Sequence, residues 1–152
     1  MARPHRRSRK RSAASSTVKR LESAVFYLDE SIYSRILAEA LEKAGAQIRR
    51  PGVDVPFGTP DTEWLRLVGA QGWIVLMRDQ RVRHRPLELE ALRAARVAAF
   101  VLTAGQASAQ QSADVISSKL QKIVNISASE LRPFVYTLSA GGALTRLKLR
   151  RG

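Results

Sequence analysis

VFYLDESIYSRILAEAL, residues 25–41, contains the change of pattern that decides the fold class. Its first four residues are apolar, as in a buried strand, and two carboxylates, Asp29 and Glu30, follow at once. A helical spacing of apolar residues then starts near Tyr33. Ending a core strand on two like charges costs free energy, because desolvation and mutual repulsion both act. The stretch therefore predicts either a positively charged partner at this point or a position in water.

Strand-like and helical patterns alternate along the rest of the chain. Such alternation predicts an α/β fold with a central, mainly parallel sheet and a C-terminal β-hairpin. Thr59 and Pro60 are the expected start of one helix, a capping hydroxyl followed by proline. The expected elements are helices at 33–44, from 59 to near 69, at 87–95 and at 108–125, strands at 25–28, 47–50, 72–77 and 98–102, and a hairpin at 133–149 that turns at Gly141 and Gly142.

The 152-residue chain is strongly basic, with 26 Lys and Arg against 13 Asp and Glu and a net charge of +13. This balance favours a polyanionic partner, nucleic acid before an anionic membrane surface. Eight of the bases, and no acid, lie in residues 1–20. Since such a composition cannot build a core, we expect a basic disordered tail over residues 1–22 and a single domain over 23–152.

Several classes of site and location are excluded or disfavoured by composition. The chain has no cysteine, which excludes disulfides and thiolate metal sites. The two histidines have no suitably spaced partners, so a zinc site or a nucleophile–histidine pair has no support. No apolar run approaches the roughly 20 residues of a membrane span. We expect a cytoplasmic protein, although an Arg- and Ser-rich start without acids also fits an organelle transit peptide.

Three acids are expected at the carboxyl ends of parallel strands, where open α/β sheets bind ligands. Asp29 follows the first strand, Asp79 follows the strand 72–77, and Asp61 lies in the first turn of the helix that follows the loop 51–60. Glu30 and Glu63 are nearby candidates for a supporting role. Each acid alone also fits a cap, a helix-dipole partner or a turn. Together they form a set of oxygen ligands that suits Mg²⁺ or Mn²⁺.

A run of arginines surrounds the last of these acids in RDQRVRHR, residues 78–85. Such a run is either a solvated charged loop or a rim that binds RNA phosphates, because guanidinium matches phosphate with two parallel hydrogen bonds. The candidate phosphate-binding residues are Arg78, Arg81, Arg83 and Arg85.

Four stretches of the chain together resemble the PIN-domain ribonucleases, specifically the PIN-like group found as toxins of bacterial toxin–antitoxin pairs. These stretches are FYLDE at 26–30, LAEALEKAGAQI at 37–48, DTEWL at 61–65 and GWIVLMRDQRVRHRP at 72–86. The resemblance extends over roughly residues 25–149. It implies a three-layer α/β/α fold and divalent-metal-dependent hydrolysis of phosphodiester bonds in RNA. Single-stranded RNA is the expected form of the substrate, because its backbone can enter a cleft and its bases can stack on aromatic side chains. The metal-binding and catalytic acids that it implies are Asp29, Asp61 and Asp79, with Glu30 and Glu63 as weaker matches.

The resemblance also implies partners, and the chain departs from the family pattern at one position. RNA is the implied substrate, and an antitoxin protein encoded nearby and a second copy of the chain are candidate protein partners. Similar proteins usually have Thr or Ser two residues before the last acid, where this chain has Met77.

Two other classes of function compete with the nuclease. A non-catalytic basic module that binds nucleic acid fits the charge, and a phospho-acceptor receiver domain fits the acids but would need a lysine that residues 97–103 lack.

Overall fold

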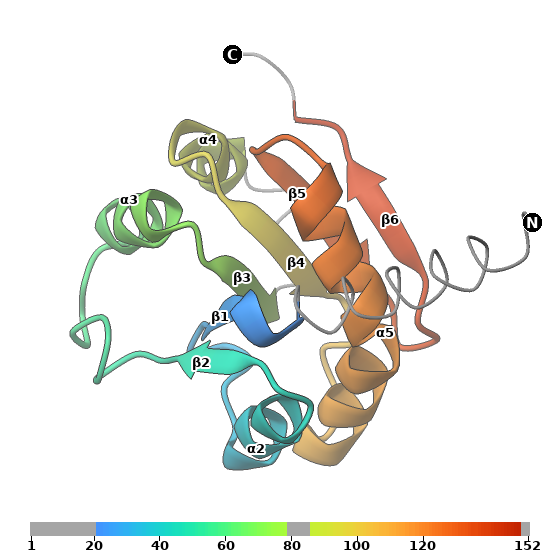
Figure 1. Ribbon diagram of the computed structural model, residues 1–152. Helices are drawn as coiled ribbons and strands as arrows, with labels where there is room; N and C mark the ends of the chain where they lie inside the picture. Colours follow the sequence, from blue (N-terminus) through green and yellow to red (C-terminus); the bar gives the residue numbers. More distant parts are fainter. Residues whose placement is uncertain (1–20, 79–85, 150–152) are drawn as a thin grey trace, which may run out of the picture.

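The fold is built on one six-stranded sheet with helices on both faces (Figure 1). The computed structural model describes residues 21–78 and 86–149, so the expected tail over residues 1–22 lies almost entirely outside the described residues. The sheet has the order β2-β1-β3-β4-β5-β6, in which the first five strands pair in parallel and β6 pairs antiparallel with β5. The strands are β1 (Val25–Leu28), β2 (Gln47–Arg49), β3 (Ile74–Arg78), β4 (Ala98–Leu102), β5 (Phe134–Leu138) and β6 (Leu144–Leu147).

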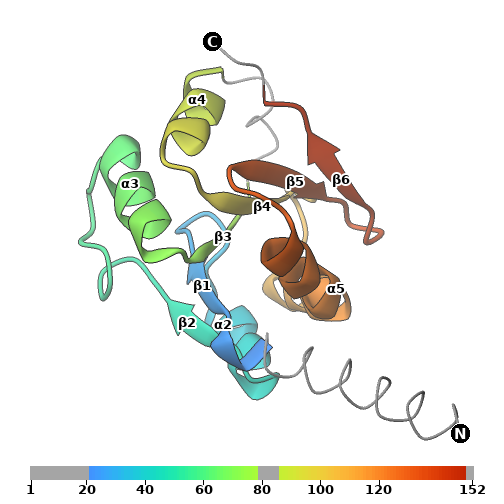
Figure 2. The same cartoon turned by 45° about the horizontal axis from the view of Figure 1, so that its top comes forward.

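Among the described residues, two helices cover each face of the sheet (Figure 2). They are α2 (Arg35–Lys43) and α5 (Ala109–Ser129) on one face, and α3 (Asp61–Gln71) and α4 (Pro86–Ala94) on the other. The predicted three-layer α/β/α fold with a mainly parallel sheet and a C-terminal hairpin is therefore confirmed. Across the two described ranges, no helix combines the length and the hydrophobicity that a membrane crossing requires.

The central strands β1 and β4 consist of apolar and aromatic residues because both of their faces are buried. Successive side chains of a strand point to opposite faces, so Phe26 and Leu28 pack toward α2 and α5 while Tyr27 packs toward α3. All five residues of β4 are buried. The hydrophobic cores on the two faces of the sheet fix how the helices pack on it, and thereby where the loops at the carboxyl edge lie.

The start and the end of α3 differ from the sequence prediction. Thr59 does not cap the helix, because its hydroxyl donates to the carbonyl oxygen of Pro56 at 2.6 Å, and Pro60 occupies the N-cap position. Gly69 does not end the helix, which continues to Gln71 and stops at Gly72 in the left-handed conformation. A Cβ at Gly69 would collide with the carbonyl oxygen of Ala95, so this glycine allows α3 to approach the turn after α4.

The other elements lie close to their predicted bounds. The helix α5 begins after Ser108, whose hydroxyl forms a capping box with Gln111, and it ends four residues later than predicted, at Ser129. Ile126 extends the helix because it packs against the core. The predicted hairpin is confirmed, with Gly142 at a positive φ of 89° in the turn. Its second strand, β6, forms one edge of the sheet, and the three-residue β2 forms the other.

Candidate active site

The carboxyl edge of the sheet includes the point between β1 and β3 at which the strand order reverses. The chain leaves β1 for β2 on one side and later returns to β3 on the other side. Loops diverge at such a reversal of strand order, and open α/β sheets bind their ligands there. The predicted acids Asp29 and Asp61 both lie at this edge.

Asp29 is held at the end of β1 by contacts of its backbone and its side chain. Its N–H donates to the carbonyl oxygen of Leu76 in β3 at 3.0 Å, which continues the sheet by one residue. Its carboxylate oxygen Oδ2 accepts hydrogen bonds from the hydroxyl of Ser31 at 2.6 Å and from the N–H of Ser31 at 3.2 Å. The side chain is thus oriented by a residue only two positions further along the chain.

Asp61 is the first residue of α3. The positive end of the helix dipole favours a carboxylate at this place. The indole Nε1 of Trp64, one turn further along the helix, donates to Asp61 Oδ1 at 2.8 Å. Because Trp64 is buried, this hydrogen bond fixes the carboxylate against the core.

A pocket with a volume of about 330 Å³ joins these two acids. Tyr27 and Trp64 line it on the core side, and residues 51–61 of the β2–α3 connection line much of the rest. The phenol of Tyr27 is buried, and burial raises its pKa above the usual range. The negative charge of Asp29 adds to this rise, so the phenol stays protonated. The pocket therefore combines carboxylates with a protonated phenol hydroxyl and the aromatic side chains of Tyr27 and Trp64.

A comparison with protein-family models finds a match to the model described as "PIN like domain" over residues 24–104, slightly more than half of the chain. The chain belongs to the PIN-like domain family. The match runs from the start of β1 to just beyond β4, so it includes all three of the acids predicted to bind metal. PIN-like domains are typically nucleases. No curated protein and no solved structure matches the chain.

The two glutamates proposed as supporting residues differ in their placement in this PIN-like domain. Glu30 lines the pocket beside Asp29. Glu63 is exposed in the first turn of α3 and is not among the residues that line the pocket. Of the two, Glu30 is the one that the fold brings to the acids.

Arg78 ends β3 and turns its side chain toward α5. Its guanidinium donates to the carbonyl oxygen of Ala107 at 3.0 Å and to the hydroxyl of Ser112. The guanidinium of Arg78 is thus bound to other residues of the PIN-like domain. Phosphate binding by Arg78 stays a prediction. The remaining predicted site residues, Asp79, Arg81, Arg83 and Arg85, lie outside the described residues.

Ser31 is a site residue that the sequence reasoning missed. Its hydroxyl donates to Asp29 and also accepts a hydrogen bond from the N–H of Arg78 at 2.9 Å. One hydroxyl thus links the acid after β1 to the residue that directly precedes Asp79. The available signal was a hydroxyl two residues after an acid at the end of a strand.

The donor set of the pocket fits a hard divalent cation. Asp29 and Asp61 each use one carboxylate oxygen in the contacts described, so each has a second oxygen to offer. Within residues 21–78 and 86–149, no group of three or more acidic or histidine side chains is close enough to form a metal site. Mg²⁺ is usually bound through one or two carboxylates and keeps several waters, so two carboxylates in one pocket are compatible with this ion.

Proposed function

We propose that this PIN-like domain is an endoribonuclease that hydrolyses phosphodiester bonds of single-stranded RNA with the help of Mg²⁺ or Mn²⁺. The observation that supports it most directly is the pocket shared by Asp29 and Asp61 at the carboxyl edge of the sheet, inside a chain with a net charge of +13. Carboxylates repel phosphate unless a cation neutralises them, and the net positive charge of the chain attracts a polyanion. Both features fit a metal-assisted nuclease.

Each acid has a role in this proposal. Asp29, Asp61 and Asp79 would hold the metal, and Glu30 would add negative charge beside them. A bound divalent cation would supply a Lewis acid that makes water more acidic and offsets negative charge on the phosphodiester. Ser31 and Trp64 keep the carboxylates of Asp29 and Asp61 in a fixed orientation.

The flanking phosphates would be held by arginines. We assign this role to Arg81, Arg83 and Arg85, with Arg78 as a candidate whose guanidinium would have to leave Ala107 and Ser112. The unpaired strand is the substrate form that we favour, because its backbone can enter a pocket while its bases stack on aromatic side chains.

The test is a cleavage assay on single-stranded RNA with Mg²⁺, Mn²⁺ or EDTA, run on the full chain and on Asp29→Asn, Asp61→Asn and Asp79→Asn. Each change should lower the cleavage rate by about 100-fold or more, because the three acids would act as a unit. The matched control is Asp114→Asn, an exposed aspartate on α5, which should cleave normally. Cleavage that persists in EDTA would refute the proposal.

Melting curves give a second readout that does not depend on turnover. A ligand that binds only the folded state raises the melting temperature. Mn²⁺ should therefore stabilise the unaltered chain and the Asp114→Asn variant, and the shift should vanish in Asp29→Asn. The competing reading, a basic module that only binds nucleic acid, gives different results. Under it, removing an acid strengthens RNA binding, and no cleavage is seen with either metal.

A narrower proposal is that the nuclease is the toxin of a bacterial toxin–antitoxin pair, with an antitoxin encoded by a neighbouring reading frame. Expression of the chain alone should then arrest growth, and co-expression with the product of that frame should restore it. Growth that is equally arrested by the Asp29→Asn variant would contradict a toxicity based on cleavage.

A further inference from the structure

A second pocket, with a volume of about 350 Å³, adjoins the acid pocket and shares Glu30 and Pro51 with it. Its other walls are Tyr33, Arg50 and the loop residues Gly52, Val53 and Phe57. The acid pocket is lined mainly by polar surface, whereas this one combines two aromatic residues with the guanidinium of Arg50 and the carboxylate of Glu30. A chain of nucleotides that enters the acid pocket has this second pocket as its immediate neighbour.

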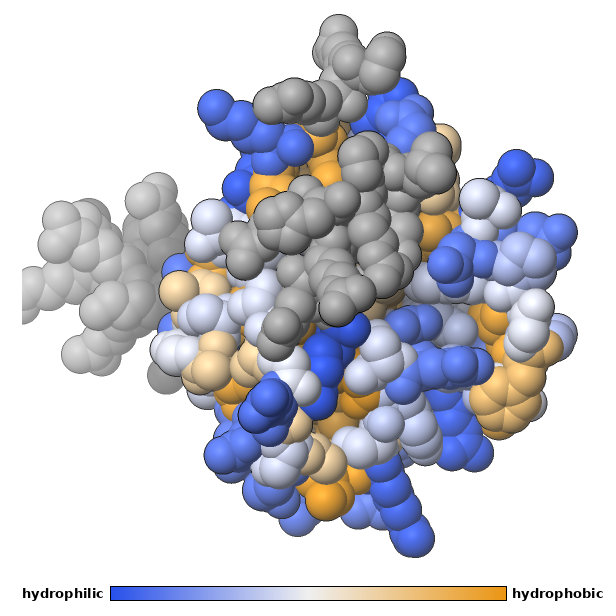
Figure 3. Space-filling model, turned by 180° about the vertical axis from the view of Figure 1, so that it is seen from behind, coloured by the Kyte–Doolittle hydropathy of each residue, from blue (hydrophilic) through white to orange (hydrophobic). Residues whose placement is uncertain are grey.

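Phe57 offers an aromatic surface to the solvent. The ring lies against Gly52, where a Cβ would collide with it, and Gly52 has a positive φ of 82°. The side chain is nevertheless 72% exposed, and the neighbouring Val53 is 67% exposed. One side of the ring thus rests on backbone, and much of its remaining surface is open. Seen from behind, hydrophobic atoms gather at the edge of the molecule where the loop between β2 and α3 lies (Figure 3).

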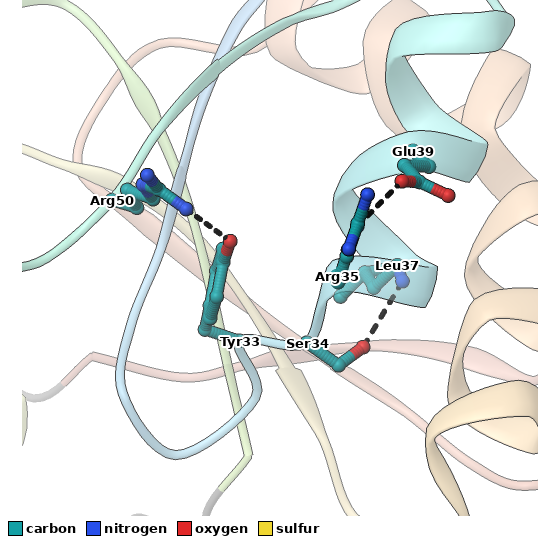
Figure 4. Close-up of polar contacts among 6 residues, drawn as sticks. All are labelled: Tyr33, Ser34, Arg35, Leu37, Glu39 and Arg50. Atoms are coloured by element: carbon teal, nitrogen blue, oxygen red, sulfur yellow. Dashed lines mark hydrogen bonds and ion pairs between the residues drawn. The ribbon is translucent and has the colours of Figure 1, made fainter.

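Tyr33 and Arg50 also line this pocket, and they are held together (Figure 4). Arg50 Nη1 donates to the hydroxyl of Tyr33 at 2.6 Å, and its guanidinium carbon lies 5.6 Å from the centroid of the Tyr33 ring. Ser34, next in the chain, caps α2 and so fixes the backbone beside Tyr33. The cation is thereby kept beside the aromatic ring.

The loop that carries Phe57 is ordered by its own hydrogen bonds. The carboxylate of Asp54 accepts from the N–H of Arg50 at 2.9 Å, and the N–H of Gly52 donates to the carbonyl oxygen of Val55 at 2.7 Å. Thr59 closes the far end through its bond to Pro56. Because these contacts restrict the loop before any ligand arrives, binding there costs little ordering entropy.

We propose that the pocket between Tyr33 and Phe57 holds one unpaired base of the RNA strand, with Phe57 as the stacking surface and Arg50 beside the phosphate of that nucleotide. This assignment rests on the proposed function, because it places the base next to the phosphate in the acid pocket. Aromatic platforms beside a cation bind single-stranded nucleic acid with little dependence on sequence. A protein partner fits less well, since a stable protein interface buries roughly 1,000 Å² or more and Val53 and Phe57 form a small patch.

The test measures binding of the full chain to a fluorescent single-stranded RNA oligonucleotide in EDTA, where cleavage is suppressed. Phe57→Ala should weaken binding by about 5- to 150-fold, the range that loss of one stacked base produces. Phe57→Trp should bind as well as the unaltered chain, whereas Phe57→Leu should resemble Phe57→Ala, because leucine keeps the bulk and loses the aromatic face. The matched control is Leu131→Ala, which removes another exposed apolar side chain, 90% exposed, away from both pockets.

Two further arms decide between stacking and other roles of Phe57. A duplex of the same sequence has no unpaired base, so Phe57→Ala should leave its affinity unchanged. An oligonucleotide that carries the fluorescent base 2-aminopurine should be quenched by the unaltered chain and not by Phe57→Leu. Equal affinities of the unaltered chain and the three Phe57 variants for single-stranded RNA would overturn the proposal and leave this pocket to a protein partner. An equal loss for single strand and duplex would overturn it too, because it would show a general effect on binding.

Failure of this inference is distinguishable from failure of the proposed function. The binding arms need neither metal nor turnover, so a chain that binds through Phe57 and never cleaves would keep the base pocket and lose the nuclease. A chain that cleaves in a metal-dependent manner with unchanged binding in Phe57→Ala would do the reverse.

Discussion

The carboxyl edge and the amino edge of the same sheet each have a pocket, and the two pockets hold their polar groups differently. At the carboxyl edge Asp29 and Asp61 are bound by residues two and three positions away in the chain. At the amino edge a pocket of about 260 Å³ is lined by the starts of β1 and β3, the end of α5, and Arg132. There Arg132 Nη1 donates to the carbonyl oxygen of Trp73 at 3.3 Å, across 59 positions of sequence.

This difference separates two uses of a polar side chain. The short-range contacts of Asp29 and Asp61 orient their carboxylates without joining distant segments, so the fold depends little on them. A long-range contact ties distant segments together, so the fold depends on it. Burial lowers the pKa of Arg132, because its charge is partly withdrawn from water. We therefore expect changes at the carboxyl edge to affect activity and changes at the amino edge to affect stability.

The largest expected effect is the loss of cleavage in the double variant Asp29→Asn/Asp61→Asn. Each single change should lose about 100-fold or more, and the double change should lose little beyond that, because residues that act as a unit are strongly non-additive. The rate of RNA cleavage measures this, and melting curves should show that all three variants fold. Multiplicative losses would mean that the two acids act independently and would contradict a shared site.

Ser31→Ala should lower cleavage by about 10- to 100-fold, the range found when a partner that orients a metal ligand is removed. The change takes away the hydroxyl that links Asp29 to Arg78 and leaves the backbone contacts in place. Ser118→Ala is the matched control, since the Ser118 hydroxyl bonds only to its own helix among the described contacts. A Ser31→Ala chain with full activity and normal metal affinity would remove this residue from the site.

Arg132→Met tests the amino edge. Methionine keeps much of the apolar stem and cannot donate to Trp73, so the free energy of unfolding should fall by about 1–2 kcal/mol. Cleavage per folded molecule should stay the same, because the pocket at this edge is at the opposite end of the strands from the acids. Chemical denaturation and the cleavage assay, run on the same preparation, measure both. A loss of activity without a loss of stability would break the division between the two edges.

The smallest effect is expected for Met77→Thr, which restores the hydroxyl usual in similar proteins. Turnover or metal affinity should rise by a few-fold only, because Ser31 already supplies a hydroxyl to Asp29. Met77 is half-buried and packs against the core beneath α3 and α4, so stability should fall by about 1 kcal/mol. Metal titrations and melting curves separate the two effects. Lower stability with no kinetic gain would show that Met77 is a core residue only.

The strands and the edge at which the acids gather could be predicted because they follow from local periodicity and from the topology of parallel sheets. The bounds of β1 and the placement of Asp29 and Asp61 in one pocket could be predicted in this way. The contacts of Ser31, Trp64 and Phe57 could not be predicted, because they depend on how each turn closes in three dimensions. The continuation of α3 past Gly69 could not be predicted for the same reason, because the close neighbour of Gly69 is Ala95, 26 positions away.

The two outer strands of the sheet, β2 and β6, also have a consequence for association between copies of the chain. β2 has three residues and β6 has four, and both contain an arginine, Arg49 and Arg146. Short edge strands with cationic side chains disfavour pairing with the edge of another molecule, because little backbone is offered and like charges approach. Growth of the sheet into aggregates at high concentration is thereby disfavoured.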